Sequence, residues 1–347
     1  MKKNIFSLAF CDAAVKKDYL DRVFFPFLSQ YKDYIFDIYF TCLVPPFDND
    51  AMNAKRHGDD SFRESMRVFE LMMNIQKRFG IRVSATFNSI KVDPTMKNLD
   101  TLIKSLKPLY ARGLRSITIP HYHWILTKKL QNEFPQMFIK NTILRKVSRP
   151  QNYVDNVEAG FNLVNIDRYN LRDRDNLKRL KKAYDKYKVP MSILVNEGCR
   201  GACPAMDEHF ELNCSADSTT PYFEQDMGMI TCESWKRLNP AYRLQSALMP
   251  SDREDFEEIL EYVQVLKLHG RTSIYSMENS MSIIRRYADP SQKYVMPGME
   301  KQLKMYNYDE KVYKAWKAMI KNCKFDCWDC DMCDKLQESA RVEEMVF

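Results

Sequence analysis

The segment Met191-Ser192-Ile193-Leu194-Val195-Asn196-Glu197 (residues 191–197) is a short apolar run that ends in two polar side chains. Such a run is typical of a buried parallel strand whose outer side is covered by helices. Similar runs recur at wide intervals along the chain. They are Asn4–Phe10, Ile35–Val44, Ile81–Phe87, Ser116–Pro120, Met137–Ile143, Leu163–Asp167 and Val263–Leu268. We therefore expect eight strands, of which Met191–Asn196 is the seventh.

The stretches between these runs have helical spacing. Phe62 to Phe79 carries an apolar stripe, and Asp175 to Tyr187 has a lysine-rich outer face that we interpret as solvated, with an RNA-facing patch as the alternative. Eight strand–helix units in about 270 residues match the usual size of a (β/α)8 TIM-like barrel, about 250 residues. An open doubly wound sheet is the alternative architecture.

The ends of the expected strands are rich in polar and thiol side chains. Barrel enzymes place their working groups where the strands end at the C-terminal face, so this pattern favours the barrel. The residues concerned are Cys11, Asp12, Cys42, Asn88, His121, His123, Asn141, Thr142, Asp167, Asn196, Glu197 and Arg271.

Two regions fall outside the regular alternation of strands and helices. Residues 197–250 form a cysteine-bearing insertion between the seventh and eighth strands, and residues 290–347 form a helical tail with a second cysteine group. We therefore expect a barrel domain over residues 1–289, which includes the insertion, followed by the tail.

Composition excludes several classes of protein. The chain has 347 residues, of which 45% are hydrophobic and 29% charged, which excludes a disordered or fibrous protein. The net charge is 53 − 46 = +7 and is dispersed, so it favours acidic partners only weakly. The nine glycines form neither of the common glycine-rich phosphate-binding loops. There is also no apolar run long enough to span a membrane.

The ten cysteines accompany no export signal, so we expect reduced thiols in the cytoplasm. Clustered cysteines in that compartment are more often metal ligands or redox groups than disulfides. Four of them follow the seventh strand with the spacing C-x3-C-x10-C-x17-C, and Gly198, Gly201 and Pro204 supply the turns that a ligand loop needs. Thiolates favour iron–sulfur clusters or zinc. The four are Cys199, Cys203, Cys214 and Cys232. The alternative is that Cys214 or Cys232 is an ordinary buried thiol.

The tail holds a second group of four cysteines within eleven residues, with the spacing C-x3-C-x2-C-x2-C. We expect it to bind a small iron–sulfur cluster or a zinc ion, with simple helix packing as the alternative. Its first three cysteines match the spacing of radical S-adenosylmethionine enzymes, but their place at the end of the chain and Asp329 before Cys330 argue against that identity. The four are Cys323, Cys327, Cys330 and Cys333.

The segment His121-Tyr122-His123 places two imidazoles on one face of a strand end, as in barrel metal hydrolases. The further ligands that such hydrolases need on other strands do not appear in order. We therefore expect substrate contact or a structural role for these histidines.

Several motifs lie around the ends of the last three expected strands. They are Asn196-Glu197-Gly198-Cys199, Cys203-Pro204, His209, Asp167 with Arg172-Asp173, and Lys267-Leu268-His269-Gly270-Arg271. In these motifs the chain resembles the collagenase-like U-thirty-two peptidase family, over roughly residues 80–275. The resemblance implies a barrel that holds a 4Fe–4S cluster on Cys199, Cys203, Cys214 and Cys232. Some members of the family are regarded as peptidases, and others resemble oxygen-independent hydroxylases of RNA nucleotides or quinone precursors.

We expect an iron–sulfur-dependent redox or modification enzyme of the hydroxylase type. A peptidase needs an activated nucleophile or a metal-bound water, and the sequence shows neither. Asp167, Asn196, His209 and Arg271 are the candidate catalytic residues at the barrel mouth, where Arg271 holds an anionic group and His209 donates a proton or supports the cluster. Alternatively, these residues form a polar rim that merely closes the barrel.

The partners that such an enzyme implies are a small-molecule, RNA or peptide substrate and an electron donor. Two alternatives remain open. A collagenase-like hydrolase would cleave peptides, and a non-catalytic RNA-binding module would retain nucleic acid with steep salt dependence.

Overall fold

The computed structural model describes residues 2–48, 61–196, 199, 201, 203–207, 239, 241, 244–246, 253–271, 273–291 and 306–342. Eight parallel strands form one sheet in the order β5-β4-β3-β2-β1-β8-β7-β6. Their bounds are β1 Phe6–Ala9, β2 Ile35–Thr41, β3 Val83–Thr86, β4 Ser116–Ile119, β5 Phe138–Asn141, β6 Val164–Ile166, β7 Met191–Leu194 and β8 Val265–Lys267. Each lies within one of the eight expected runs.

The two outer strands of this order, β5 and β6, meet and close the sheet into a barrel. Lys140 forms a parallel bridge with Leu163, and the side chains of Asn141 and Asn165 join the strand ends. The Asn165 amide donates to Asn141 Oδ1 at 2.5 Å, and Asn141 Nδ2 donates to the Asn165 carbonyl at 3.2 Å. The predicted (β/α)8 TIM-like barrel is therefore confirmed, and the open-sheet alternative is wrong.

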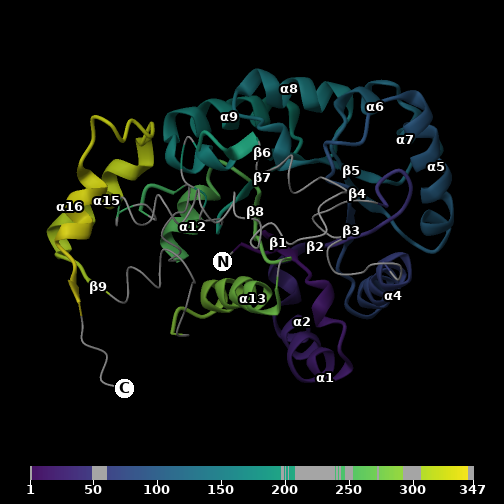
Figure 1. Cartoon of the computed structure of the whole chain (residues 1–347), viewed down its shortest axis with the longest axis horizontal. Helices are drawn as coiled ribbons and strands as arrows, with labels where there is room; N and C mark the ends of the chain where they lie inside the picture. Colours follow the sequence, from purple (N-terminus) through teal and green to yellow (C-terminus); the bar gives the residue numbers. More distant parts are fainter. Residues whose placement is uncertain are drawn as a thin grey trace.

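Helices surround the strands on the outside (Figure 1). The principal ones are α2 Phe25–Tyr31, α4 Ser61–Phe79, α5 Met96–Ala111, α8 Pro150–Ala159, α9 Arg174–Tyr187, α12 Arg253–Ile259 and α13 Ile274–Ala288. Short helices complete the loops: η1 Asp12–Ala14, α1 Lys17–Tyr19, η2 Leu20–Phe24, η3 Lys32–Tyr34, α6 Tyr122–Leu126, α7 Lys129–Glu133, η5 Ile143–Arg145 and η6 Arg168–Arg172. Among the helices of the described residues, none combines the length and apolar character needed to cross a bilayer.

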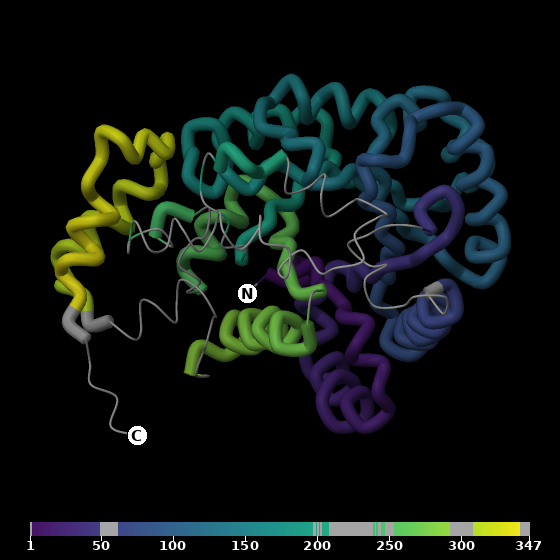
Figure 2. The backbone as a smooth tube through the Cα atoms, in the orientation of Figure 1, coloured from purple at the N-terminus to yellow at the C-terminus, as the bar shows by residue number. Residues whose placement is uncertain are grey.

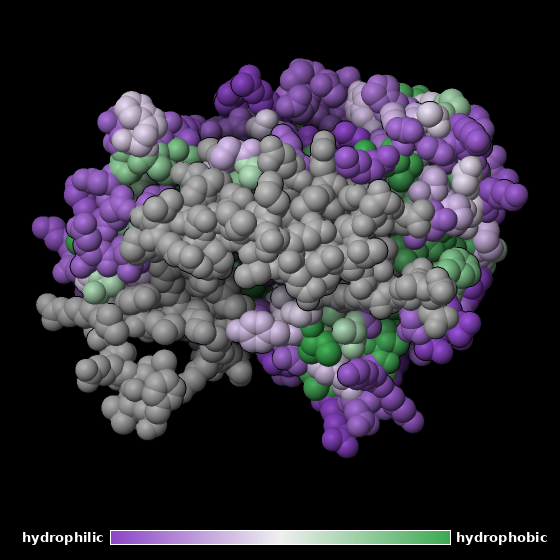
Figure 3. Space-filling view, in the orientation of Figure 1, coloured by the Kyte–Doolittle hydropathy of each residue, from purple (hydrophilic) through white to green (hydrophobic). Residues whose placement is uncertain are grey.

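The apolar core lies between the strands and the helices. On α4, Val68, Met72 and Ile75 are buried at helical spacing, as the sequence predicts. Phe6 on β1 packs edge-on against Phe256 of α12, with ring centroids 6.1 Å apart. The opposite, outward side of the helices is polar, and Figure 3 shows a mainly hydrophilic rim around the described surface.

Side-chain caps fix the start of the elements that follow β6 and β8. Asp167 accepts a hydrogen bond from the Tyr169 amide at the start of η6, and Asp173 accepts one from the Asn176 amide at the start of α9. Ser273 caps α13 in the same way. These caps place η6 and α9 immediately beyond the C-terminal end of β6.

The described part of the tail consists of α15 Glu310–Met319, η9 Ile320–Asn322 and α16 Met332–Glu338, with a two-stranded ribbon of β9 Tyr306–Asn307 and β10 Arg341–Val342. It lies beside η6, α9 and α12, at the yellow end of the tube in Figure 2. Ion pairs hold it there: Lys317 with Asp255 at 2.9 Å, and Lys321 with Glu258 at 2.7 Å.

Candidate functional site

The interior of the barrel is polar and centres on a buried ion pair. Asp37 on β2 is fully buried, and it receives Lys140 Nζ from β5 and Ser7 Oγ from β1, each at 2.5 Å. Strands β2 and β5 are separated by β3 and β4 in the sheet, so the pair spans the inside of the barrel. Buried charges persist only when they are paired and hydrogen-bonded, and here both conditions are met.

Further cations gather towards the C-terminal end of β8. Lys267 is only 8% exposed, and its Nζ lies 4.6 Å from the centroid of the Tyr39 ring. Burial, together with the positive charges of Lys140 and Arg271, lowers the pKa of Lys267 to about 7 against the opposing effect of Asp37. This amine therefore exchanges its proton close to neutral pH.

Two more groups extend this cationic region. Arg271 Nη1 donates to Thr41 Oγ1 at 3.3 Å, and its guanidinium lies 5.7 Å from the Tyr39 ring. Burial, together with the positive charges of Arg271 and Arg168, lowers the pKa of His269 to about 4. His269 is therefore neutral at physiological pH. Lys140, Lys267, Arg168 and Arg271, together with Tyr39, form what we call the cationic mouth.

Asn196 braces this region. Its Nδ2 donates to the His269 carbonyl at 3.0 Å and to Ser280 Oγ at 3.2 Å, and its Oδ1 accepts from the His269 amide at 2.6 Å. Both polar atoms of the amide are thus engaged with the segment after β8 and with α13. This geometry gives Asn196 a positioning role beside the cationic mouth.

Asp167 lies at the end of β6, where it caps η6. It also lines a cavity of about 610 Å³ between the barrel and the tail. The cavity wall includes Arg149, Tyr169 and Arg179 from the barrel and Cys323 from the tail. Among the described residues, Asp167 therefore faces the cavity beside the tail, whereas Lys267 and Asn196 lie at the barrel mouth. The sequence analysis places Asp167 and Asn196 together at that mouth.

The cysteine loop after β7 is described at Cys199, Gly201 and Cys203. Both cysteines are half-buried, and both act on the nearby phenol of Tyr169, whose pKa is raised mainly by burial. The Gly201 amide donates to the Gln245 carbonyl at 2.9 Å, and the Phe325 ring occupies the space that a Cβ at Gly201 would need. The predicted ligands Cys214 and Cys232, the candidate His209 and the strand-end residue Glu197 lie outside the described residues.

These observations bear on whether the loop suits a 4Fe–4S cluster. Two thiols lie near one phenol on either side of Gly201, and the predicted donor set consists of sulfur alone, which fits such a cluster. Within the described ranges, no three cysteine, histidine or acidic side chains are close enough together to enclose a metal ion. The cluster therefore remains a prediction whose ligands would be Cys199, Cys203, Cys214 and Cys232.

Three of the tail cysteines lie between η9 and α16, and Cys333 lies in the first turn of α16. Cys333 is buried, Cys323 and Cys327 are half-buried, and Cys330 is exposed. The structure brings Cys323, Cys327 and Cys333 near the guanidinium of Arg172 on η6. Packing of Cys323, Cys327 and Cys330 on one helix face, the alternative interpretation, is wrong because α16 begins only at Met332.

The two histidines after β4 do not share a face of a strand, so this expectation is wrong. The strand ends at Ile119, and His123 lies exposed on α6, whereas His121 is buried before the helix. Burial and the charge of Arg145 lower the pKa of His121 to about 4. Arg145 Nη2 lies 3.1 Å from His121 Nδ1, which gives His121 a structural role.

Two other thiols at strand ends are deeply buried. Burial raises the pKa of Cys42 to about 12, so it is a thiol and a poor nucleophile at neutral pH. Cys11 is also fully buried, at the end of β1.

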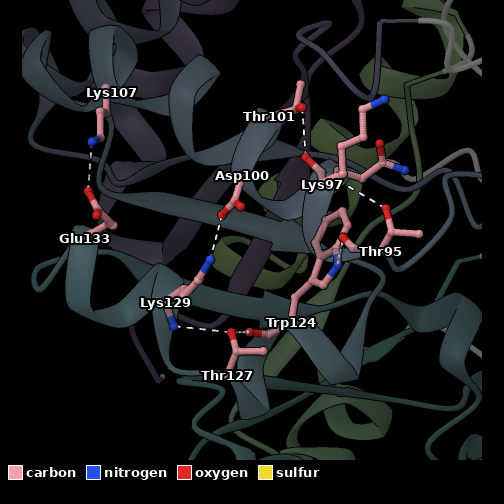
Figure 4. A network of polar contacts seen from close by, with 10 residues as sticks. Thr95, Lys97, Asp100, Thr101, Lys107, Trp124, Thr127, Lys129 and Glu133 are labelled. Carbon is pink, nitrogen blue, oxygen red and sulfur yellow. Dashed lines mark hydrogen bonds and ion pairs between the residues drawn. The ribbon is translucent and has the colours of Figure 1, made fainter.

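A second hollow, of about 430 Å³, lies on the outside of the barrel between α5 and α7. Its charged residues pair with one another, Lys129 with Asp100 at 2.9 Å and Lys107 with Glu133 at 3.0 Å (Figure 4). These side chains are half-exposed, so the hollow is a solvated surface feature.

Sequence reasoning missed the ion pair and the role of Lys267. The available signal was a charged residue inside an otherwise apolar strand: Asp37 within Ile35–Val44 and Lys140 within Met137–Ile143. Lys267 stands out in the sequence only through the family resemblance.

Comparison with known proteins supports the architecture. No family model matches the sequence, and no curated protein matches it. A solved structure described as that of the U32 peptidase Mk0906 is similar, with a TM-score of 0.51 over 78% of this chain and 93% of that chain, at 12% sequence identity. At this identity the likeness concerns the fold: the chain has a barrel like that of the U32 peptidase.

Proposed function

We propose that the chain is an iron–sulfur-dependent barrel enzyme that modifies an anionic substrate by oxygen-independent redox chemistry. One observation carries the proposal. Two thiols of the predicted ligand loop, Cys199 and Cys203, follow β7, and the cationic mouth lies at the end of the neighbouring strand β8. A redox group and a substrate held at these two places would share one end of the barrel, where barrel enzymes act.

The cations supply the binding. Arg271 presents a planar guanidinium that suits a carboxylate or phosphate. Burial and then the neighbouring cations drive Lys267 towards its neutral form, and an incoming anion opposes both effects by favouring the charged amine. Because the region is buried, each of these interactions is stronger than in water. Asn196 keeps the segment that carries Arg271 in register through its bonds to His269.

A 4Fe–4S cluster, when bound, supplies one-electron transfer or activation of a substrate atom. The protein residues beside it have separate roles. Tyr169 is half-buried near Cys199 and Cys203, and its ring lies 5.4 Å from that of Phe325. Lys267, with a pKa of about 7, is placed to hold or release a proton near neutral pH.

Peptide hydrolysis is the second candidate, because the similar solved structure is described as a U32 peptidase. The side chains available for it argue against it. Cys42 is a protonated thiol, and His121 is buried against Arg145. A non-catalytic RNA-binding module has less support, because lysines on the outer face of α9 pair with acids of the same helix, as Lys178 does with Asp175 and Lys181 with Asp185.

Metal and sulfide analysis of protein purified without oxygen tests the proposal. We expect a brown protein that air bleaches, and loss of about four irons per chain in Cys199→Ala. Cys42→Ala is the matched control, since it removes a buried thiol at another strand end and should retain the iron. A colourless protein, or equal iron in Cys199→Ala and the parent, contradicts the proposal. Peptide cleavage that persists in Cys199→Ala after iron is lost supports the hydrolase instead.

A further inference from the structure

Residues 323–333 comprise the loop after η9 and the first two residues of α16, and they carry four of the ten cysteines. We call this segment the tail loop. It contains little regular structure, and its middle is solvent-exposed, with Trp328 86% exposed. Phe325 adopts a left-handed backbone with φ of 62°. A metal bound by these thiols would hold such an irregular loop in one conformation.

Arg172 provides the first structural reason to place a metal there. This guanidinium is fully buried, and it lies 5.8 Å from the centroid of the Trp316 ring and 5.7 Å from that of the Phe325 ring. The Trp316 side chain and the Phe325 amide donate to the sulfurs of Cys333 and Cys323, so the buried cation lies beside the residues that contact the first and last tail thiols. Four thiolates around zinc or a 4Fe–4S core carry a net negative charge, which a buried arginine would compensate.

Hydrogen bonds to the sulfurs provide the second reason. Trp316 Nε1 lies 3.3 Å from Cys333 Sγ, and the Phe325 amide lies 3.4 Å from Cys323 Sγ. N–H donors aimed at sulfur stabilise metal-bound thiolates and tune the centres that these form. The first and last cysteines of the tail loop are therefore each supplied with a donor.

The start of the tail loop is also fixed on the barrel. Lys324 pairs with Asp173 at 2.7 Å, just after Cys323. Lys321 pairs with Glu258, which also receives Arg174 Nε at 2.8 Å. With its start anchored and Cys333 buried at its other end, the loop has fewer conformations to lose when a metal orders the segment around Cys327 and Cys330.

We propose that Cys323, Cys327, Cys330 and Cys333 bind a second metal centre, a zinc ion or an iron–sulfur cluster, and that Arg172 balances its charge. Among the described residues these four thiols do not enclose a metal ion, so binding has to draw them together, the exposed Cys330 included. The centre is separate from the cluster proposed for the loop after β7. Phe325 lies against Gly201 of that loop and 5.4 Å from the Tyr169 ring, so the two centres flank the same pair of aromatic residues.

Metal content of the full-length chain, purified without oxygen, tests this second site. Cys330→Ala is the principal variant, because Cys330 is exposed and its loss removes no buried contact. We expect it to lose about one zinc or about four irons per chain relative to the parent, and to keep the metal that Cys199→Ala loses. Whether Cys330→Ala loses zinc or iron shows whether the second centre is a zinc ion or an iron–sulfur cluster. Cys42→Ala is the control.

Fluorescence gives a second readout, independent of any activity. Trp328 lies between Cys327 and Cys330, so metal binding should change its emission, and Trp328→Phe assigns the signal. A chelator should reverse that change in the parent and have no effect in Cys330→Ala. Equal metal content in the parent, Cys330→Ala and Cys327→Ser, with a Trp328 signal that no chelator alters, would overturn the second site. That result would not contradict the separate proposal of a cluster in the loop after β7.

Discussion

Along β2, Asp37 and Tyr39 point into the barrel, whereas Ile38 and Phe40 belong to the apolar core outside it. The same alternation runs through the neighbouring strands. The inner face carries Ser7, Ser84, Thr86, Ser116, Thr118, Lys140, Asn165, Ser192 and Lys267, all of them buried. A barrel of this type usually fills its interior with branched apolar side chains.

The contrast between the two faces separates stability from function. The outer face packs against helices and supplies most of the apolar burial that drives folding. The inner face contributes a charged network that is costly to desolvate and gives little net stability. We infer that the polar interior is retained for binding, which agrees with the cationic mouth at the end of β8.

Breaking the central ion pair should have the largest effect. Asp37→Ala leaves Lys140 buried without its carboxylate, and removal of one partner of a buried pair costs about 3–5 kcal/mol. We expect a loss of that size in the free energy of unfolding, measured by denaturant titration. A cost below about 1 kcal/mol, the usual value of an exposed pair, would show that water reaches Lys140.

Two controls sharpen this result. The double variant Asp37→Leu with Lys140→Met replaces the pair by apolar groups and should recover much of the lost stability. Leu106→Ala removes a fully buried outer-layer side chain on α5 and should cost about 2–5 kcal/mol by leaving a cavity. Leu106→Ala should leave the proton affinity of Lys267 unchanged, whereas Asp37→Ala should lower it.

The sequence predicts the fold well and the site in part. All eight strands can be predicted because each is an apolar run between helical patterns. The predicted runs differ from the observed strands only in length, as in Asn4–Phe10 and Leu163–Asp167, which extend beyond β1 and β6 at their ends. The interior was not predicted, because the partners of Asp37 come from distant segments, Ser7 and Lys140. Sequence spacing also could not show that Asp167 faces the tail, since that placement depends on how Cys323 and Phe325 dock.

Lys267 provides a pH-dependent test of the inner face. Its folded pKa of about 7 lies below the ordinary lysine value of about 10.4. Between these two pH values Lys267 is protonated in the unfolded chain but not in the folded protein. The free energy of unfolding should therefore rise with pH from about 7 to 10. Lys267→Met should abolish this contribution and raise stability at neutral pH.

Amine labelling followed by mass spectrometry measures the same group directly. Lys267 should reach half-maximal acylation near pH 7, and added inorganic sulfate should move the midpoint upward by stabilising the charged amine. A midpoint near 10 would contradict the cationic mouth. A midpoint near pH 7 that sulfate does not move would confirm the low pKa of the buried amine but would contradict anion binding beside it.

The smallest effect concerns two threonines whose register places them side by side, Thr86 on β3 and Thr118 on β4. Neither hydroxyl oxygen has a hydrogen-bond partner among the residues that the structure describes. Replacing a buried, unpartnered hydroxyl by a methyl group of the same shape removes a desolvation cost, so Thr86→Val should stabilise the fold by about 1 kcal/mol. Ser116→Ala is the opposite control, because its Oγ donates to Ser84 at 3.1 Å and its loss should destabilise by about the same amount. If Thr86→Val destabilises instead, its hydroxyl must be bonded to water inside the barrel, and the polar face of these strands is then hydrated up to the Asp37–Lys140 pair.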